Sequence, residues 1–234
     1  MSKFCLVLVW VWLIMPMPAT VLCADTQVTD SDKWTTDFGI DPSELSSTGR
    51  NPYFILEPGY QLYYEDGEDS LTITVLDETR RIDNIETRVV EEREISEGEL
   101  AEVSRNFYAI STRNNSVFYF GEEVDIYKDG KVVKHEGAWV SGQDGARFGL
   151  MMPGQVLIGG RHYQEIAPGV AMDRAEIISQ DETRDTPIGA FEHCLKVLET
   201  TPLSPREREF KYYAPGVGLV QEQSLKLVRY GMTP

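Results

Sequence analysis

The side chains best suited to coordinate a metal are two histidines and the donors near them. His135 and His162 could supply imidazoles, Glu165 a carboxylate, and Met151 and Met152 soft sulfurs. Imidazole and thioether together suit copper better than zinc. No histidine pair has i, i+4 or His-x-His spacing, so a site would depend on the fold. A copper-type binding protein or a metal-dependent enzyme is the alternative hypothesis, and the preferred one has no cofactor.

Nucleophilic catalysis has little support in the residue pattern. The sequence contains no Gly-x-Ser-x-Gly elbow of the hydrolase type. His193 and Cys194 are adjacent, but neighbours on a strand point to opposite faces and cannot act as a pair. Cys194 is therefore predicted to be a small buried apolar residue. Acidic residues are so abundant that no particular carboxylate pair is indicated for glycoside chemistry.

Aromatic and methionine side chains are the best candidates for binding an apolar ligand. The candidate binding residues are Phe107, Phe118, Phe120, Tyr127, Trp139, Phe148, Met151 and Met152. The last three belong to the glycine-rich apolar segment 142–160, which could cover the open end of a sheet or form its mouth. Aromatic residues also fill ordinary cores, so packing is the competing interpretation.

The N-terminus predicts export. An apolar run from Phe4 to Met15 follows Lys3 and leads to small residues near Ala24. This run is too short for a comfortable membrane span and matches a secretory signal peptide. We expect residues 1–24 to be removed, with cleavage after Cys23 as an alternative. The working protein would then be periplasmic or extracellular, without a transmembrane anchor.

Charge and cysteine content narrow the class of protein. The formal net charge is −16, which disfavours binding to nucleic acids and anionic membranes. After signal cleavage only Cys194 remains, so the fold cannot depend on an internal disulfide. The polar segment 25–33 is predicted to be disordered. No linker divides residues 34–234, which we expect to form a single domain.

The elements that must position these side chains are predicted to be antiparallel strands. Short β-favouring runs alternate with Asp-Gly and Asn-Asn turns along the chain. The expected strands are 71–76, 85–95, 100–110, 117–127 and 132–140, with hairpin turns at Glu97-Gly98 and Asp129-Gly130. Residues 171–179 are also assigned to a strand.

Two local signals add detail to this pattern. Asp41 could cap a short helix that begins at Pro42 and ends by Gly49. The tetrapeptide Ala-Pro-Gly-Val occurs at 167–170 and again at 214–217. Proline followed by glycine suits the central positions of a type II turn, so we interpret the repeat as reused turn geometry.

The stretch 212–220, Tyr-Tyr-Ala-Pro-Gly-Val-Gly-Leu-Val, resembles the closing motif of an uncharacterised family of secreted bacterial proteins, and 189–197 is similar to its lead-in. The resemblance extends to 42–56, 124–139 and 149–176. It implies export but carries no catalytic residues. At the level of fold, the closing strands look like the curved sheets of periplasmic lipoprotein carriers, which implies a concave face for an apolar ligand.

These observations predict a mainly β protein, a single curved antiparallel sheet or partial barrel of meandering hairpins with a short N-terminal helix. The expected function is non-catalytic binding in the cell envelope. The partner would be an apolar small molecule or lipid, or an envelope protein, held on the concave face of the sheet.

Overall fold

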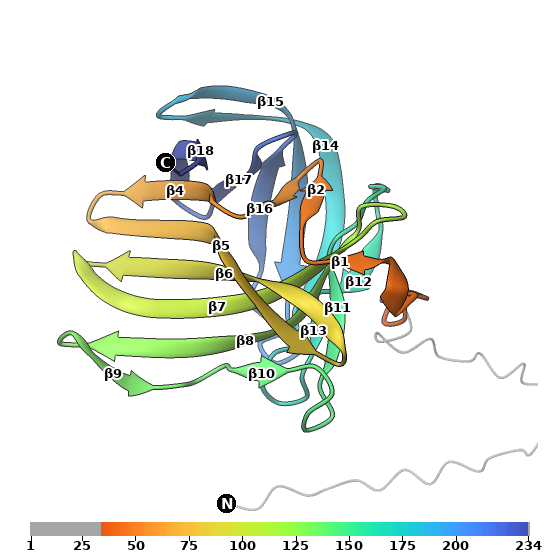
Figure 1. Cartoon of the computed structure of the whole chain (residues 1–234). Helices are drawn as coiled ribbons and strands as arrows, with labels where there is room; N and C mark the ends of the chain where they lie inside the picture. The colour runs from red at the N-terminus through yellow and green to blue at the C-terminus, as the bar shows by residue number, and fades with distance from the viewer. Residues whose placement is uncertain (1–33, 234) are drawn as a thin grey trace, which may run out of the picture.

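The computed structural model describes residues 34–233 (Figure 1). The predicted signal peptide and the segment 25–33 lie outside this range, so these two predictions are not tested. Within the described range, strands dominate, and no helix is long and apolar enough to cross a membrane.

One large antiparallel sheet contains most of the chain. Its path is β12 (Arg161–Tyr163), β14 (Arg174–Thr186), β15 (Gly189–Thr200), β16 (Glu209–Ala214), β17 (Gly218–Glu222), β18 (Leu225–Met232), β4 (Tyr60–Asp66), β5 (Asp69–Ile82), β6 (Ile85–Ser96), β7 (Glu99–Ser111), β8 (Val117–Lys128), β11 (Arg147–Met152) and β13 (Glu165–Ile166). The two ends of this path, β12 and β13, are separated in the chain by Gln164 alone. The sheet is therefore strongly curved and nearly closed (Figure 1).

Five short strands complete the structure. β1 (Leu45–Ser46) pairs with β7, whereas β9 (Lys131–Lys134) and β10 (Trp139–Val140) pair with β8. β2 (Gly49–Asn51) and β3 (Phe54–Leu56) form a separate hairpin. The predicted fold class, a curved mainly β sheet of hairpins, is confirmed.

The turns explain why this order of strands forms. At the β6–β7 turn, Glu97 and Gly98 have φ of 52° and 80°, and at the β8–β9 turn Asp129 and Gly130 have φ of 51° and 71°. Two consecutive residues with positive φ match the right-handed twist of a hairpin. Both predicted hairpin turns are confirmed.

The repeated tetrapeptide forms the same turn twice. Val170 N–H donates to Ala167 O at 2.9 Å, and Val217 N–H donates to Ala214 O at 3.2 Å. The intervening Gly169 and Gly216 have φ of 77° and 76°. A positive φ at the third residue, where only glycine is unstrained, fits a type II turn, so the structural interpretation of the repeat is confirmed.

The predicted N-terminal helix is not formed as expected. Asp41 does cap a turn, since Ser43 N–H donates to its carboxylate at 2.9 Å, but the turn is a 3-10 helix limited to Pro42–Glu44. Leu45 already pairs with Ser111 of β7. Strand pairing and packing of Leu45 against the sheet outweigh the local helix signal.

Two separate hydrophobic clusters result from the alternation of side chains along β7. Tyr108 and Ile110 point into the curved sheet, whereas Phe107 and Ala109 point to its other face. We call the cluster that contains Tyr108 and Ile110 the inner cluster, and its residues come from strands around the whole sheet. The second, the outer cluster, consists of Ile82, Ile85, Val89, Phe107, Ala109, Phe118 and Phe120.

The outer cluster is covered by the N-terminal segment of the domain. Phe38, Ile40 and Leu45 pack against it, together with Phe148. This cover removes from water a sheet face that would otherwise be exposed, and burial of apolar area stabilises the fold. β7 and β8 are thus buried on both faces.

Candidate functional site

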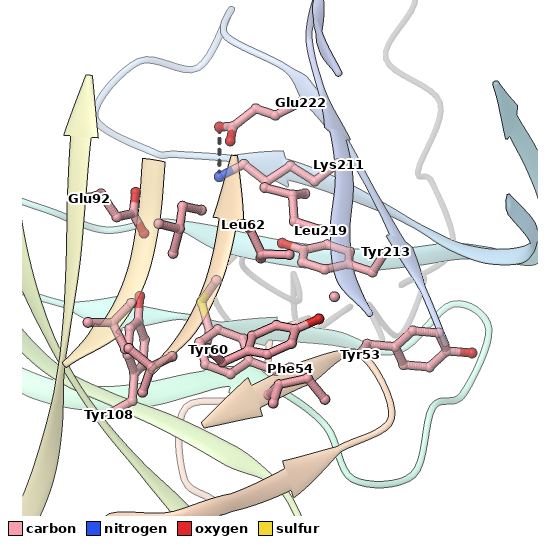
Figure 2. A pocket seen from close by; sticks show the side chains of 16 residues that line it. Tyr53, Phe54, Tyr60, Leu62, Glu92, Tyr108, Lys211, Tyr213, Leu219 and Glu222 are labelled. Carbon is pink, nitrogen blue, oxygen red and sulfur yellow. Dashed lines mark ion pairs between the residues drawn. The ribbon is translucent and has the colours of Figure 1, made fainter. Parts of the chain in front are cut away.

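A cavity within the curved sheet is the candidate functional site (Figure 2). Its volume is about 620 Å³ when the part open to solvent is included. The enclosed space in which the centre of a water molecule fits is about 70 Å³. It is lined by Tyr53, Phe54, Ile55, Tyr60, Leu62, Ile73, Val75, Val90, Glu92, Tyr108, Met151, Lys211, Tyr213, Gly218, Leu219 and Glu222. Such a mainly apolar wall with a few polar groups is typical of a small-molecule site.

The β2–β3 hairpin forms one wall of this cavity. Its turn is fixed by Asn51, 1% exposed, whose amide donates to Asn115 O at 2.9 Å and to Pro153 O at 3.0 Å. The Gly216 N–H donates to Pro52 O at 2.7 Å. The hairpin is therefore held to distant parts of the chain by several hydrogen bonds to buried groups.

The aromatic side chains of the cavity are held in fixed orientations. Tyr60 donates its hydroxyl to Val217 O at 2.8 Å, and burial raises its pKa to about 12. The rings of Phe54 and Tyr108 meet edge to face with centroids 5.0 Å apart. Tyr108 also stacks on Tyr119 at 4.7 Å. These contacts limit ring rotation, so the wall is preorganised.

A cluster of charged residues occupies the other end of the cavity. Lys211 Nζ lies 2.9 Å from Glu199 Oε2 and 3.1 Å from Glu222 Oε1, with 19% of the lysine side chain exposed. We call these three residues the Lys211 cluster. Burial alone would lower the pKa of Lys211, but Glu199 and then Glu222 outweigh it and hold that pKa well above its usual value. Lys211 thus remains a cation.

Glu92 from β6 is a further carboxyl in the same wall. Its side chain is surrounded by protein and borders the cavity, and among residues 34–233 it has no hydrogen-bond or ion-pair partner within contact distance. Burial, and next the negative charge of Glu222, raise the pKa of Glu92 to about 7, although Lys211 opposes this. Figure 2 shows Glu92 on the same side of the cavity as Lys211 and Glu222, with Tyr60, Phe54 and Tyr108 at the other end.

The surroundings of the cavity on the charged side are acidic. A second hollow shares Glu92 and Glu222 with the cavity. Its lining is Asp69, Ser70, Leu71, Glu92, Glu94, Ile95, Glu222, Gln223, Ser224 and Leu225, with no Lys or Arg among these residues. A ligand that approaches from this side meets carboxyl groups before it meets Lys211.

Three of the residues predicted to bind a ligand lie on the inner face. Met151 lines the cavity. Met152, 1% exposed, and Trp139, 6% exposed, are packed in the inner cluster without lining that cavity. Trp139 meets Tyr119 edge to face at 5.2 Å, and it also borders a separate surface hollow with Glu122.

The other predicted binding residues lie elsewhere. Phe107, Phe118 and Phe120 face the outer cluster, and Phe148 stacks on Phe120 at 4.9 Å. The period of two along β7 and β8 places these side chains on the face opposite to the one assigned from sequence. Tyr127 lies near the end of β8, partly exposed and outside both clusters. Their binding role stays a prediction that the geometry does not favour.

The residues of the metal hypothesis are separated as well. His135 is exposed and its Nδ1 lies 2.7 Å from Asp125 Oδ1. His162 is buried, and burial lowers its pKa to about 4. Glu165 accepts a hydrogen bond from Asp173 N–H at 2.6 Å. Across the part of the chain that the structure describes, no three His, Cys, Asp or Glu side chains are placed to hold a metal ion.

Sequence reasoning missed Lys211, Glu92 and Glu222. A signal for Lys211 was present in the segment 209–214, Glu-Phe-Lys-Tyr-Tyr-Ala, where alternation puts Lys211 on the same face as Tyr213. A charged residue that shares a face with core aromatics is a candidate for a buried polar site.

Comparisons with protein-family models, with curated proteins and with solved structures gave no match. The function of this chain is therefore inferred from its own sequence and geometry.

Proposed function

We propose that this chain is an exported, non-catalytic binding protein that holds a small, largely apolar molecule in the cavity of its curved sheet. The observation that carries the proposal is the position of the cavity, enclosed by strands from both halves of the sheet and walled by aromatic residues. The outer cluster offers a contrast, since its aromatic rings pack on one another. The apolar N-terminal run and the resemblance to secreted proteins support the localisation.

The size of the cavity favours a compact ligand over a lipid with long chains. The roughly 70 Å³ that water centres reach corresponds to a few water molecules, at about 10 to 15 Å³ each. A longer apolar ligand would need the β2–β3 hairpin to move, and Asn51 holds that hairpin with two hydrogen bonds. We therefore propose a ligand with a single small apolar group in the cavity.

Native mass spectrometry of protein isolated gently from its own host tests this proposal. We expect a reproducible added mass of a few hundred daltons or less, lost in the variant Ile73→Trp, whose larger side chain fills the cavity. The matched variant Val140→Trp enlarges a residue against the outer cluster and should keep the added mass. A bare mass for the wild-type protein, together with no effect of Ile73→Trp on any small-molecule titration, would contradict the proposal.

A further inference from the structure

We infer that the ligand of this cavity is a compact cation, an ammonium group with small apolar substituents. This inference rests on the proposed function and specifies its ligand. The carboxyl of Glu92 borders the cavity without a partner among the residues described, opposite a wall of aromatic rings. Rings and a carboxylate around one space are the two features that recognise organic ammonium ions.

The charge count at this site favours a cation over an anion. Lys211 is the single basic residue that lines the cavity, and Glu199 and Glu222 already neutralise it. Glu209, two residues before Lys211 on the same strand, adds another carboxyl, and its buried Oε1 has no hydrogen-bond partner in the described range. With Glu92 the site holds an excess of carboxyls. An anionic ligand would be repelled, whereas a cation would supply the missing charge.

The hollow next to the cavity has the same preference. The hollow beside Glu92 and Glu222 also presents Asp69 and Glu94, with no basic side chain in its lining. Carboxylates at a partly enclosed mouth raise the local concentration of cations, and the effect falls as salt increases. The net charge of −16 acts in the same direction over longer distances.

The aromatic end of the cavity provides a surface for the substituents of the ammonium group. The ring of Tyr108 is fixed by Phe54 and Tyr119, and Tyr60 is fixed by its hydrogen bond to Val217 O. A cation within about 6 Å of such a ring centre is attracted to the negative face of the ring. Because water reaches little of this space, the attraction is screened less than at the surface.

Glu92 should make the affinity depend on pH. Its pKa of about 7 means that it is neutral in acid and charged above neutrality, so a cation should bind more tightly at pH 8 than at pH 5.5. The titratable and charged groups that act on it from the surrounding strands are Tyr64, Glu102, Tyr108, Glu122, Lys211, Tyr213 and Glu222. Burial raises the pKa of Glu122 to about 7 as well, so Glu122 titrates over the same range as Glu92.

Three probes of nearly equal size and shape test the inference at constant ionic strength and pH 8. They are tetramethylammonium, the neutral 2,2-dimethylpropan-1-ol and the anion 2,2-dimethylpropanoate, each titrated by NMR against the wild-type protein. We expect saturable binding of tetramethylammonium, at least about tenfold tighter than that of either other probe, since about 1.4 kcal/mol of charge attraction gives that factor. Shifts should centre on Tyr60 and Tyr108.

A charge-matched pair of variants locates the effect. Glu92→Gln should weaken tetramethylammonium binding about tenfold at pH 8 and reduce its pH dependence, whereas Glu192→Gln, an exposed change on β15 with the same loss of charge, should leave both unchanged. Heteronuclear spectra of each variant establish that it is folded.

The outcomes separate this inference from the proposed function. If the neutral or the anionic probe bound as tightly as tetramethylammonium, or more tightly, the inference of a cationic ligand would be wrong. The proposal that the cavity binds an apolar ligand would still stand. An unchanged affinity in Glu92→Gln would also overturn the role of the cavity carboxyl. No saturable binding of any probe, with a bare mass for protein from its host, would overturn both.

Discussion

The inner cavity and the outer cluster are built from the same strands, yet they differ in what fills them. In β8, Phe118 and Phe120 point outward and pack against Phe148. Tyr119 between them points inward, toward polar groups and the cavity wall formed by Tyr108. The outer cluster consists of apolar side chains, with the Arg80 guanidinium lying over the Phe107 ring at 4.6 Å. The inner face also carries tyrosine hydroxyls, carboxyls and a lysine. The comparison indicates that aromatic content alone does not distinguish the two faces, and that the inner face differs by its cavity beside Glu92 and Lys211.

The largest expected effect is on the outer cluster. Phe120 is 1% exposed and stacks on Phe148, so Phe120→Ala should lower the free energy of unfolding by about 3 to 5 kcal/mol. Phe54→Ala should cost less, because the Phe54 ring already borders the cavity and is partly exposed. Urea unfolding followed by circular dichroism measures both. If Phe120→Ala and Phe54→Ala lowered the free energy of unfolding equally, the outer cluster and the cavity wall would not differ in how tightly they are packed.

The next effect concerns the buried carboxyl of the inner face. The pKa of Glu92 is about 7 in the folded protein, mainly through burial, against 4.5 when unfolded. The folded state therefore binds the proton more tightly, and this stabilisation is complete below pH 4.5 and lost as pH rises through 7. Glu92→Gln should be about 2 to 3 kcal/mol more stable than the wild type at pH 8 and nearly equal to it below pH 4.5.

Urea unfolding of both proteins at pH 4 and pH 8 checks this expectation, with Glu192→Gln as the exposed control. The partly buried Glu122 and Glu209, also with pKa values raised to about 7 by burial, should make the wild type lose stability over the same window. If Glu92→Gln were less stable than the wild type at pH 8, the carboxylate would have a partner that stabilises its charge.

A smaller effect is expected in the cover of the outer cluster. Asp41 caps the turn that leads Phe38 and Ile40 across the sheet to Leu45. Asp41→Ala removes the hydrogen bond from Ser43 N–H and should lower the melting temperature by less than Phe120→Ala does, since a side-chain cap stabilises only the first turn. Asp41→Asn, which keeps an acceptor, is the matched control, and thermal unfolding measures both. If Asp41→Ala destabilised the protein as much as Phe120→Ala, the N-terminal segment with Phe38, Ile40 and Leu45 would detach from the outer cluster as a unit.

The sequence could predict the strands because their signals are local. Alternation in the segment 71–76 and the residues with positive φ at Glu97-Gly98 depend on neighbours in the chain. The helical turn after Asp41 begins at Pro42 as predicted but ends at Glu44, because Leu45 pairs with Ser111, which is far away in sequence. Propensity cannot report a contact of this kind.

The candidate site was harder to predict because alternation does not say which face is concave. Assigning Phe118 and Phe120 to one face was correct, but the sheet curves so that Tyr119 faces inward instead. Lys211 of β16 and Glu92 of β6 line the same cavity only because the curved sheet brings these two strands together around it. No spacing in the sequence records that approach, since more than a hundred positions separate the two residues in the chain.

The smallest expected effect is at Tyr127, which sequence reasoning placed in the binding site. Tyr127 pairs with Val132 of β9, itself 42% exposed, next to the turn of the β8–β9 hairpin. It lines neither the cavity nor the outer cluster. Tyr127→Ala should therefore change the free energy of unfolding by no more than about 0.5 kcal/mol, the range of ordinary surface substitutions.

Tetramethylammonium affinity should likewise be unchanged in Tyr127→Ala, as measured by the same NMR titration used for the cavity variants. Tyr108→Ala is the contrasting variant, because Tyr108 differs in lining the cavity and being 4% exposed. If Tyr127→Ala markedly weakened tetramethylammonium binding and Tyr108→Ala did not, the binding site would lie near the turn end of the β8–β9 hairpin instead of in the cavity. This result would also reverse the comparison between the two faces, since unfilled space would then no longer mark the site.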